Sequence, residues 1–98
     1  MLYMDTFNFN QKTPKEINKM IAERIRNIRK RRKLSQEKLS EKSGVSLGSV
    51  KRFENIGEIS LSSLTKLAIA LDCENELEQL FEDIPFESIQ EVIDGQNK

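Results

Sequence analysis

The segment of residues 36–55 restricts the fold more than any other part of the chain, because it has the pattern of two short helices joined by a tight turn. Helices joined in this way pack at a steep angle. They need a small residue where they approach each other and a residue that tolerates left-handed backbone angles at the turn. Ser40 and Gly44 meet these two needs. A shared apolar junction is expected from Leu39, Val45, Val50 and Phe53.

Start signals and apolar periodicity predict three further helices around this pair. Thr13 and Glu16 form a capping box with Pro14 at the first helical position, and this helix is predicted to end in the basic run 29–33. The other helices are expected over residues 36–43, 47–54, 60–71 and 75–81, with residues 55–57 as a loop. The apolar faces of the outer helices are predicted to consist of Ile17, Met20, Ile21, Ile25, Ile28, Leu61, Leu64, Leu67, Ala68, Leu71, Leu77, Leu80 and Phe81.

The charge of the chain is divided between its two parts. Residues 1–52 carry fourteen Lys and Arg against five Asp and Glu, a net charge of +9, and residues 53–98 carry a net charge of −9. A basic front and an acidic back indicate a polyanion as partner, and DNA is the obvious polyanion. The basic run 29–33 is either a nucleic-acid patch or only a solvated helix end, and some of its residues are expected to face DNA.

Missing residue types exclude several kinds of chemistry. The chain has no histidine, which removes Cys/His zinc sites, Ser-His-Asp triads and imidazole acid-base catalysis. Cys73 is the only cysteine, so no internal disulfide forms, and a buried, inert thiol is expected. No glycine-rich phosphate loop or metal-ligand cluster appears, so we expect neither an enzyme nor a cofactor or metal site. Neither a signal peptide nor a membrane-spanning run is apparent, which favours a cytoplasmic protein.

Together with its flanks, the segment of residues 36–55 resembles the Cro/lambda-repressor type of helix-turn-helix, often called the Xre family, over residues 17–81. The resemblance implies an all-α, five-helix lambda-repressor-like DNA-binding bundle at residues 13–83. It leaves a loose arm at residues 1–12 and an acidic, partly apolar extension at residues 84–98. The implied function is a sequence-specific transcriptional regulator, a repressor, that binds double-stranded DNA as a homodimer. Its recognition helix would enter the major groove of a palindromic operator.

The resemblance also implies roles for individual residues. Gln36 matches a glutamine that contacts a backbone phosphate, and Asn55 matches a loop residue that approaches the next phosphate. Arg29 and Glu54 match a charge pair between the first helix and the end of the recognition helix. As a pair they are either a buried bridge or two unrelated surface charges. Gly48 departs from the polar reader of many relatives, and either permits close backbone approach to DNA or marks a missing reader. The exposed part of the recognition helix is Ser46, Leu47, Gly48, Ser49, Lys51 and Arg52.

A second interpretation starts from residues 46–64, which resemble HipB-like antitoxins. Those proteins neutralise a HipA-like kinase toxin and autorepress their operon, and the extension after Asp83 would then be the element that binds the toxin. The apolar residues of this extension are expected to cover the core or a dimer seam, and they are Phe86, Ile89, Val92 and Ile93.

Overall fold

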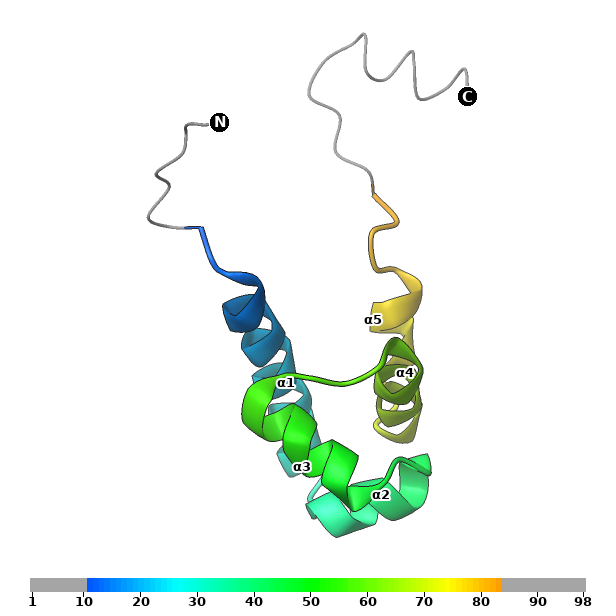
Figure 1. The fold of residues 1–98 in the computed structure, drawn as a ribbon. Coiled ribbons are helices and arrows are strands. Elements are labelled where there is room, and N and C mark those ends of the chain that lie inside the picture. The colour runs from blue at the N-terminus through cyan, green and yellow to red at the C-terminus, as the bar shows by residue number, and fades with distance from the viewer. Residues whose placement is uncertain (1–10, 84–98) are drawn as a thin grey trace, which may run out of the picture.

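The computed structural model describes residues 11–83, which form five α-helices and no strand. The helices are α1 (Pro14–Arg31), α2 (Gln36–Ser43), α3 (Leu47–Ile56), α4 (Leu61–Ala70) and α5 (Glu74–Glu78). The prediction of an all-α, five-helix bundle is confirmed. In Figure 1, α2 and α3 lie at one end, and from there α1 diverges from α4 and α5. The predicted extension at residues 84–98 lies outside the described residues, as does the predicted arm apart from residues 11 and 12.

The first four helices begin where the start signals indicate, whereas α5 begins at Glu74 without a side-chain cap. The Thr13 hydroxyl accepts a hydrogen bond from the backbone N–H of Glu16, whose carboxylate accepts one from the Thr13 N–H, so the capping box is complete. Ser35, Ser46 and Ser60 cap α2, α3 and α4 with their side chains. Such caps satisfy backbone donors that have no partner inside the helix. The bounds of α2 agree with the prediction.

The end of α3 differs from the prediction, because residues 55 and 56 are helical and not part of a loop. Gly57 ends the helix, with φ of 81° in the left-handed region and its N–H donating to the Phe53 carbonyl at 2.8 Å. A glycine that follows the last helical residue is a strong stop signal. The helix therefore extends to the glycine.

The core lies where α3 packs on α1 and α2, and where α2 packs on α4. All four residues predicted for the apolar junction are buried, which confirms that part of the pattern. Among the described residues, Arg29 is the buried charged residue. No helix within residues 11–83 has both the length and the apolar character needed to cross a membrane. The buried hydrophobic residues are Ala22, Ile25, Leu39, Val45, Val50, Phe53, Leu67, Ala68 and Leu71.

The outer ends of the bundle are less buried than the periodicity predicts. Ile17 and Ile21 on α1 are 41% and 37% exposed, because the first half of α1 diverges from α4 and α5 (Figure 1). The helix α5 ends at Glu78, before its predicted end, and Phe81 has a left-handed φ of 61° and is 85% exposed. Leu61 and Leu80 are also exposed, and Cys73 is half-buried where a buried thiol was predicted.

Candidate nucleic-acid interface

The turn between α2 and α3 is held by hydrogen bonds among residues 40–45. The Ser40 hydroxyl donates to the Val45 carbonyl at 2.6 Å, and the Val45 N–H donates to the Ser43 hydroxyl at 3.1 Å. Gly44 has φ of 76°, and its N–H donates to the Ser40 carbonyl at 2.9 Å. Ser40 is therefore small and also supplies a donor to the turn. This second role holds the start of α3 at a set distance from α2.

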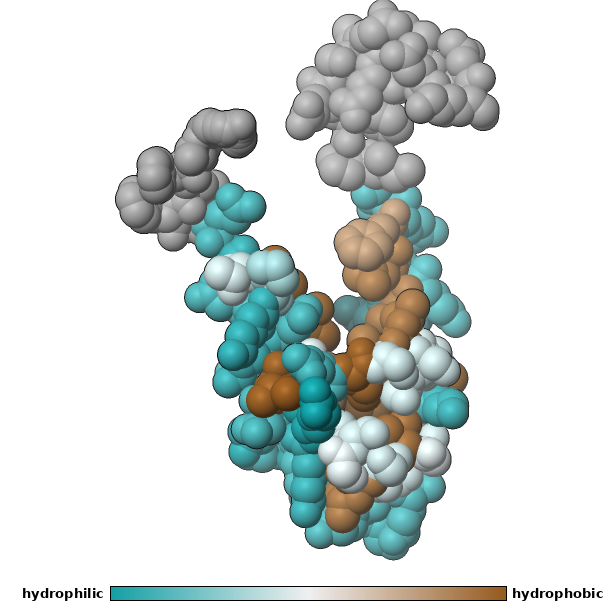
Figure 2. Space-filling model, in the orientation of Figure 1, coloured by the Kyte–Doolittle hydropathy of each residue, from teal (hydrophilic) through white to brown (hydrophobic). Residues whose placement is uncertain are grey.

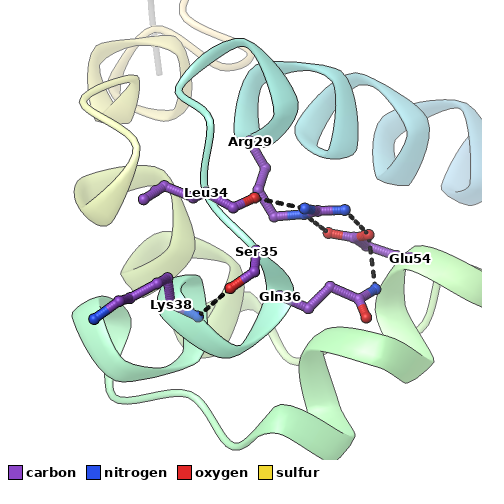
Figure 3. A network of polar contacts seen from close by, with 6 residues as sticks. All are labelled: Arg29, Leu34, Ser35, Gln36, Lys38 and Glu54. Carbon is purple, nitrogen blue, oxygen red and sulfur yellow. Dashed lines mark hydrogen bonds and ion pairs between the residues drawn. The ribbon is translucent and has the colours of Figure 1, made fainter.

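A buried ion pair links α1 to the last turn of α3. Nε and Nη2 of Arg29 donate to Oε2 and Oε1 of Glu54 at 2.8 and 3.0 Å, a bidentate arrangement that Figure 3 shows from close by. The two side chains are only 9% and 4% exposed. Nη1 of Arg29 donates to the Leu34 carbonyl at 2.7 Å, so the same guanidinium also binds the loop before α2. Of the two arrangements left open for this pair, the structure has the buried bridge.

Gln36 joins this network at the start of α2. Its amide nitrogen donates to Oε1 of Glu54 at 3.0 Å (Figure 3). Burial raises the pKa of the Glu54 carboxyl, but the hydrogen bonds from Arg29 and Gln36 outweigh burial and leave that pKa below its ordinary value. The carboxylate is thus charged at neutral pH and orients the glutamine. An amide nitrogen carries two hydrogens, and the bond to Glu54 uses one of them.

The helix α3 presents most of its predicted site residues to solvent. Gly48, Lys51, Arg52 and Asn55 are exposed. Leu47 and Ser49 are half-buried. Val50 and Phe53 are buried on the opposite side of α3. The solvent-exposed side therefore carries the cations of Lys51 and Arg52 and the amide of Asn55.

Ser46 has a structural role that competes with DNA contact. Its hydroxyl accepts from the Ser49 N–H at 3.1 Å and donates to the Ser49 hydroxyl at 2.9 Å. The hydroxyl hydrogen of Ser46 is therefore already bonded to Ser49.

The basic run 29–33 differs within itself. Arg29 is paired with Glu54, whereas the other four residues of the run are exposed.

Arg52 has a partner that the sequence did not reveal. Its Nη2 lies in an ion pair with Oε1 of Glu58, and the two side chains are 64% and 58% exposed. Glu58 follows the turn at Gly57, six residues after Arg52, which is not a spacing that pairs charges within a helix. Only the reversal of the chain at Gly57 brings the two together. This acid therefore lies beside a cation that was predicted to contact DNA.

The helices α2 and α3, the turn between them and the network of Arg29, Gln36 and Glu54 all lie in the part of the chain that matches a known family. The helix-turn-helix family model matches residues 25–74, about half of the sequence. This chain belongs to the helix-turn-helix family. The match is of the Cro/C1 type and identifies a DNA-binding regulator, in which α2 and α3 form the helix-turn-helix. Comparison with curated proteins gives no match.

Gly48 offers a test of how closely this helix-turn-helix approaches DNA. A Cβ at Gly48 would meet no atom of the described residues within 4 Å. Gly48→Ala is therefore expected to stabilise the protein by about 1 kcal/mol, because alanine favours the helix more than glycine does. Thermal unfolding would measure this gain, and an unchanged or lower stability would contradict it. Titration of the same variant with DNA then decides between the two interpretations of Gly48. Weaker binding by a more stable protein favours close backbone approach, and unchanged binding favours a missing reader.

Proposed function

We propose that this helix-turn-helix protein is a transcriptional repressor that binds a palindromic operator as a homodimer. In this proposal α3 lies in the major groove, where Lys51 and Arg52 donate to guanine or to phosphate oxygens. Gln36 and Asn55 contact phosphates on either side and set the register. Twofold symmetry of the dimer would place two half-sites about 34 Å apart.

The buried network of Arg29, Glu54 and Gln36 is the observation that carries this proposal. It ties α1, the loop before α2 and the end of α3 to one carboxylate, so α3 has a fixed direction relative to the start of α2. The exposed side of α3 is thereby held at a fixed distance from Gln36. Base reading and phosphate contact need this kind of rigid spacing, because a groove and its flanking phosphates are themselves at fixed distances.

A titration against the DNA upstream of its own gene, with a shuffled sequence as competitor, tests the function. Tight binding that prefers the upstream DNA is expected, together with affinity that falls steeply as salt rises, since phosphate contacts release counterions. Equal affinity for both sequences at all salt concentrations would contradict a sequence-specific regulator.

Arg52→Ala is expected to weaken operator binding by roughly tenfold to a hundredfold for each half-site, since one good contact to a base contributes about 1–3 kcal/mol and the dimer loses one in each half-site. If Arg52 contacts phosphate instead, the loss would be similar for all sequences and the salt slope would fall by about 1 for each half-site. Lys15→Ala removes an exposed cation near the start of α1 and is the matched control. Equal behaviour of the two variants would overturn the assignment of α3 as the reading helix.

Glu58→Gln is expected to act in the opposite direction, because the carboxylate holds the Arg52 guanidinium and repels phosphate. An exposed ion pair contributes about 0–1 kcal/mol, so the gain in DNA affinity should be at most about fivefold for each half-site. Only the hold on the guanidinium requires Arg52, so the gain should shrink to the part that comes from phosphate repulsion when Glu58→Gln is made in the Arg52→Ala background. Fluorescence anisotropy with labelled operator measures all four proteins, and weaker binding by Glu58→Gln would contradict this account.

The antitoxin interpretation stays a prediction, since no contact among residues 11–83 favours it. Co-purification with a neighbouring kinase-like gene product is its test.

A further inference from the structure

An apolar groove lies between α1 on one side and α4 and α5 on the other, away from α2 and α3. It has a volume of about 220 Å³, and its walls include Ile21 and Ile28 of α1, Leu64 of α4, and Leu77 and Leu80 near α5. Figure 2 shows apolar surface along the α4–α5 side that continues down towards α1. The mainly apolar lining suits the apolar side chains of another segment.

The groove continues in both directions along α1. Towards the end of α1, a second hollow shares Ile28, Cys73 and Glu76 with it and adds Arg31 and Arg32. Towards the start of α1, a third hollow shares Ile21 and Leu64 with it. Arg24 also lines the groove itself. The result is a long apolar surface with Arg24, Arg31 and Arg32 along its α1 side and Glu76 on its α5 side. Large apolar side chains left exposed in this way usually mark a docking site.

We propose that residues 86–93 of the same chain, which lie outside the described residues, dock in this groove as a short amphipathic helix. Their apolar residues Phe86, Ile89, Val92 and Ile93 recur at helical spacing. The acids between and after them, Glu87, Glu91 and Asp94, complement the cations along α1. The proposal does not depend on whether the protein is a repressor.

Chain length favours this segment over a second copy of the protein. Phe86 follows the groove residue Leu80 by six residues, which span up to about 20 Å when extended. A short link of this kind gives an effective concentration in the millimolar range. At micromolar protein, a second copy would have to bind correspondingly more tightly to displace the chain's own segment.

Cys73 makes the proposal measurable, because it is the single cysteine of the chain and lines the groove. A helix in the groove would cover the thiol and slow its reaction with iodoacetamide. Ile89→Asp places a charge in the middle of the apolar stripe. Ser88→Asp adds the same side chain about 100° away around a helix and is the matched control. Both variants are made in the full chain and compared at one pH, so the added charge is equal.

Iodoacetamide should react with Cys73 about tenfold faster in Ile89→Asp than in the original protein. The reason is that the variant loses the burial of one isoleucine in the groove. Ser88→Asp should react at the original rate, and all rates should be independent of protein concentration. Equal rates in all three proteins would overturn the proposal. In the original protein, the rate of the Cys73 reaction could fall as protein concentration rises. That result would also overturn the proposal and assign the groove to a second copy. Circular dichroism of each variant checks that a fast reaction does not reflect unfolding.

Discussion

Gly57→Ala is expected to lower the free energy of unfolding by about 2–5 kcal/mol, whereas Gly44→Ala should lower it by only about 1–2 kcal/mol. Both glycines end a helix in the left-handed region, with φ of 81° and 76°, so a Cβ costs similar backbone strain at either position. They differ in what that Cβ would meet. At Gly57 it would lie 2.9 Å from the carbonyl carbon of Asn18 and 2.9 Å from the backbone nitrogen of Lys19, and at Gly44 nothing lies within 4 Å.

The difference between the two variants measures how closely α3 approaches α1. Backbone atoms of a helix cannot move aside like the end of a flexible side chain, so Gly57→Ala must push the two helices apart. Denaturant unfolding followed by circular dichroism gives both values. If Gly57→Ala and Gly44→Ala were equally destabilised, left-handed strain alone would explain both, and the close contact of α3 with α1 would be wrong.

The start of each of the first four helices could be predicted because it depends on neighbours in the sequence. Ser35 caps α2 through a residue three positions later, and no distant part of the chain is needed. The exposure of Ile17 could not be predicted in this way. Periodicity shows that a helix has an apolar face, but whether another element reaches that face depends on the packing of α4 and α5.

In the candidate site, too, some features depend on neighbouring residues and others depend on distant parts of the chain. The sequence suggested the Arg29–Glu54 pair only through the family resemblance, because the two are 25 residues apart and their burial depends on three elements. The pairing of Arg52 with Glu58 depends on the angle at which the chain turns at Gly57, and no local pattern records that angle. The role of Ser46 as a cap was visible in the sequence, and the structure adds a second bond, in which the Ser46 hydroxyl donates its hydrogen to the Ser49 hydroxyl.

Glu54→Ala is expected to destabilise the protein by about 3–5 kcal/mol, because it leaves the Arg29 guanidinium buried without its counter-charge. Many small domains have a total stability of about 5–15 kcal/mol, so this variant should be close to unfolding. Glu41→Ala is the control, since Glu41 pairs with Lys38 at 3.4 Å and both side chains are more than half exposed. An exposed pair of this kind should contribute about 0–1 kcal/mol. Similar losses in the two variants would show that the network does not hold the helices together.

The pH dependence of stability provides an independent measurement of the same carboxylate. The pKa of Glu54 is below its ordinary value of 4.5, so the folded protein binds a proton there less readily than the unfolded chain. The stabilisation from this shift is fully present above about pH 4.5 and is lost as pH falls through the lower pKa of the folded state. Glu54→Gln has no such carboxylate. Its deficit in unfolding free energy relative to the original protein should therefore be largest at neutral pH and shrink in acid. A deficit that stayed constant from neutral pH to well below pH 4.5 would mean that the charge of Glu54 does not stabilise the junction of α1, α2 and α3.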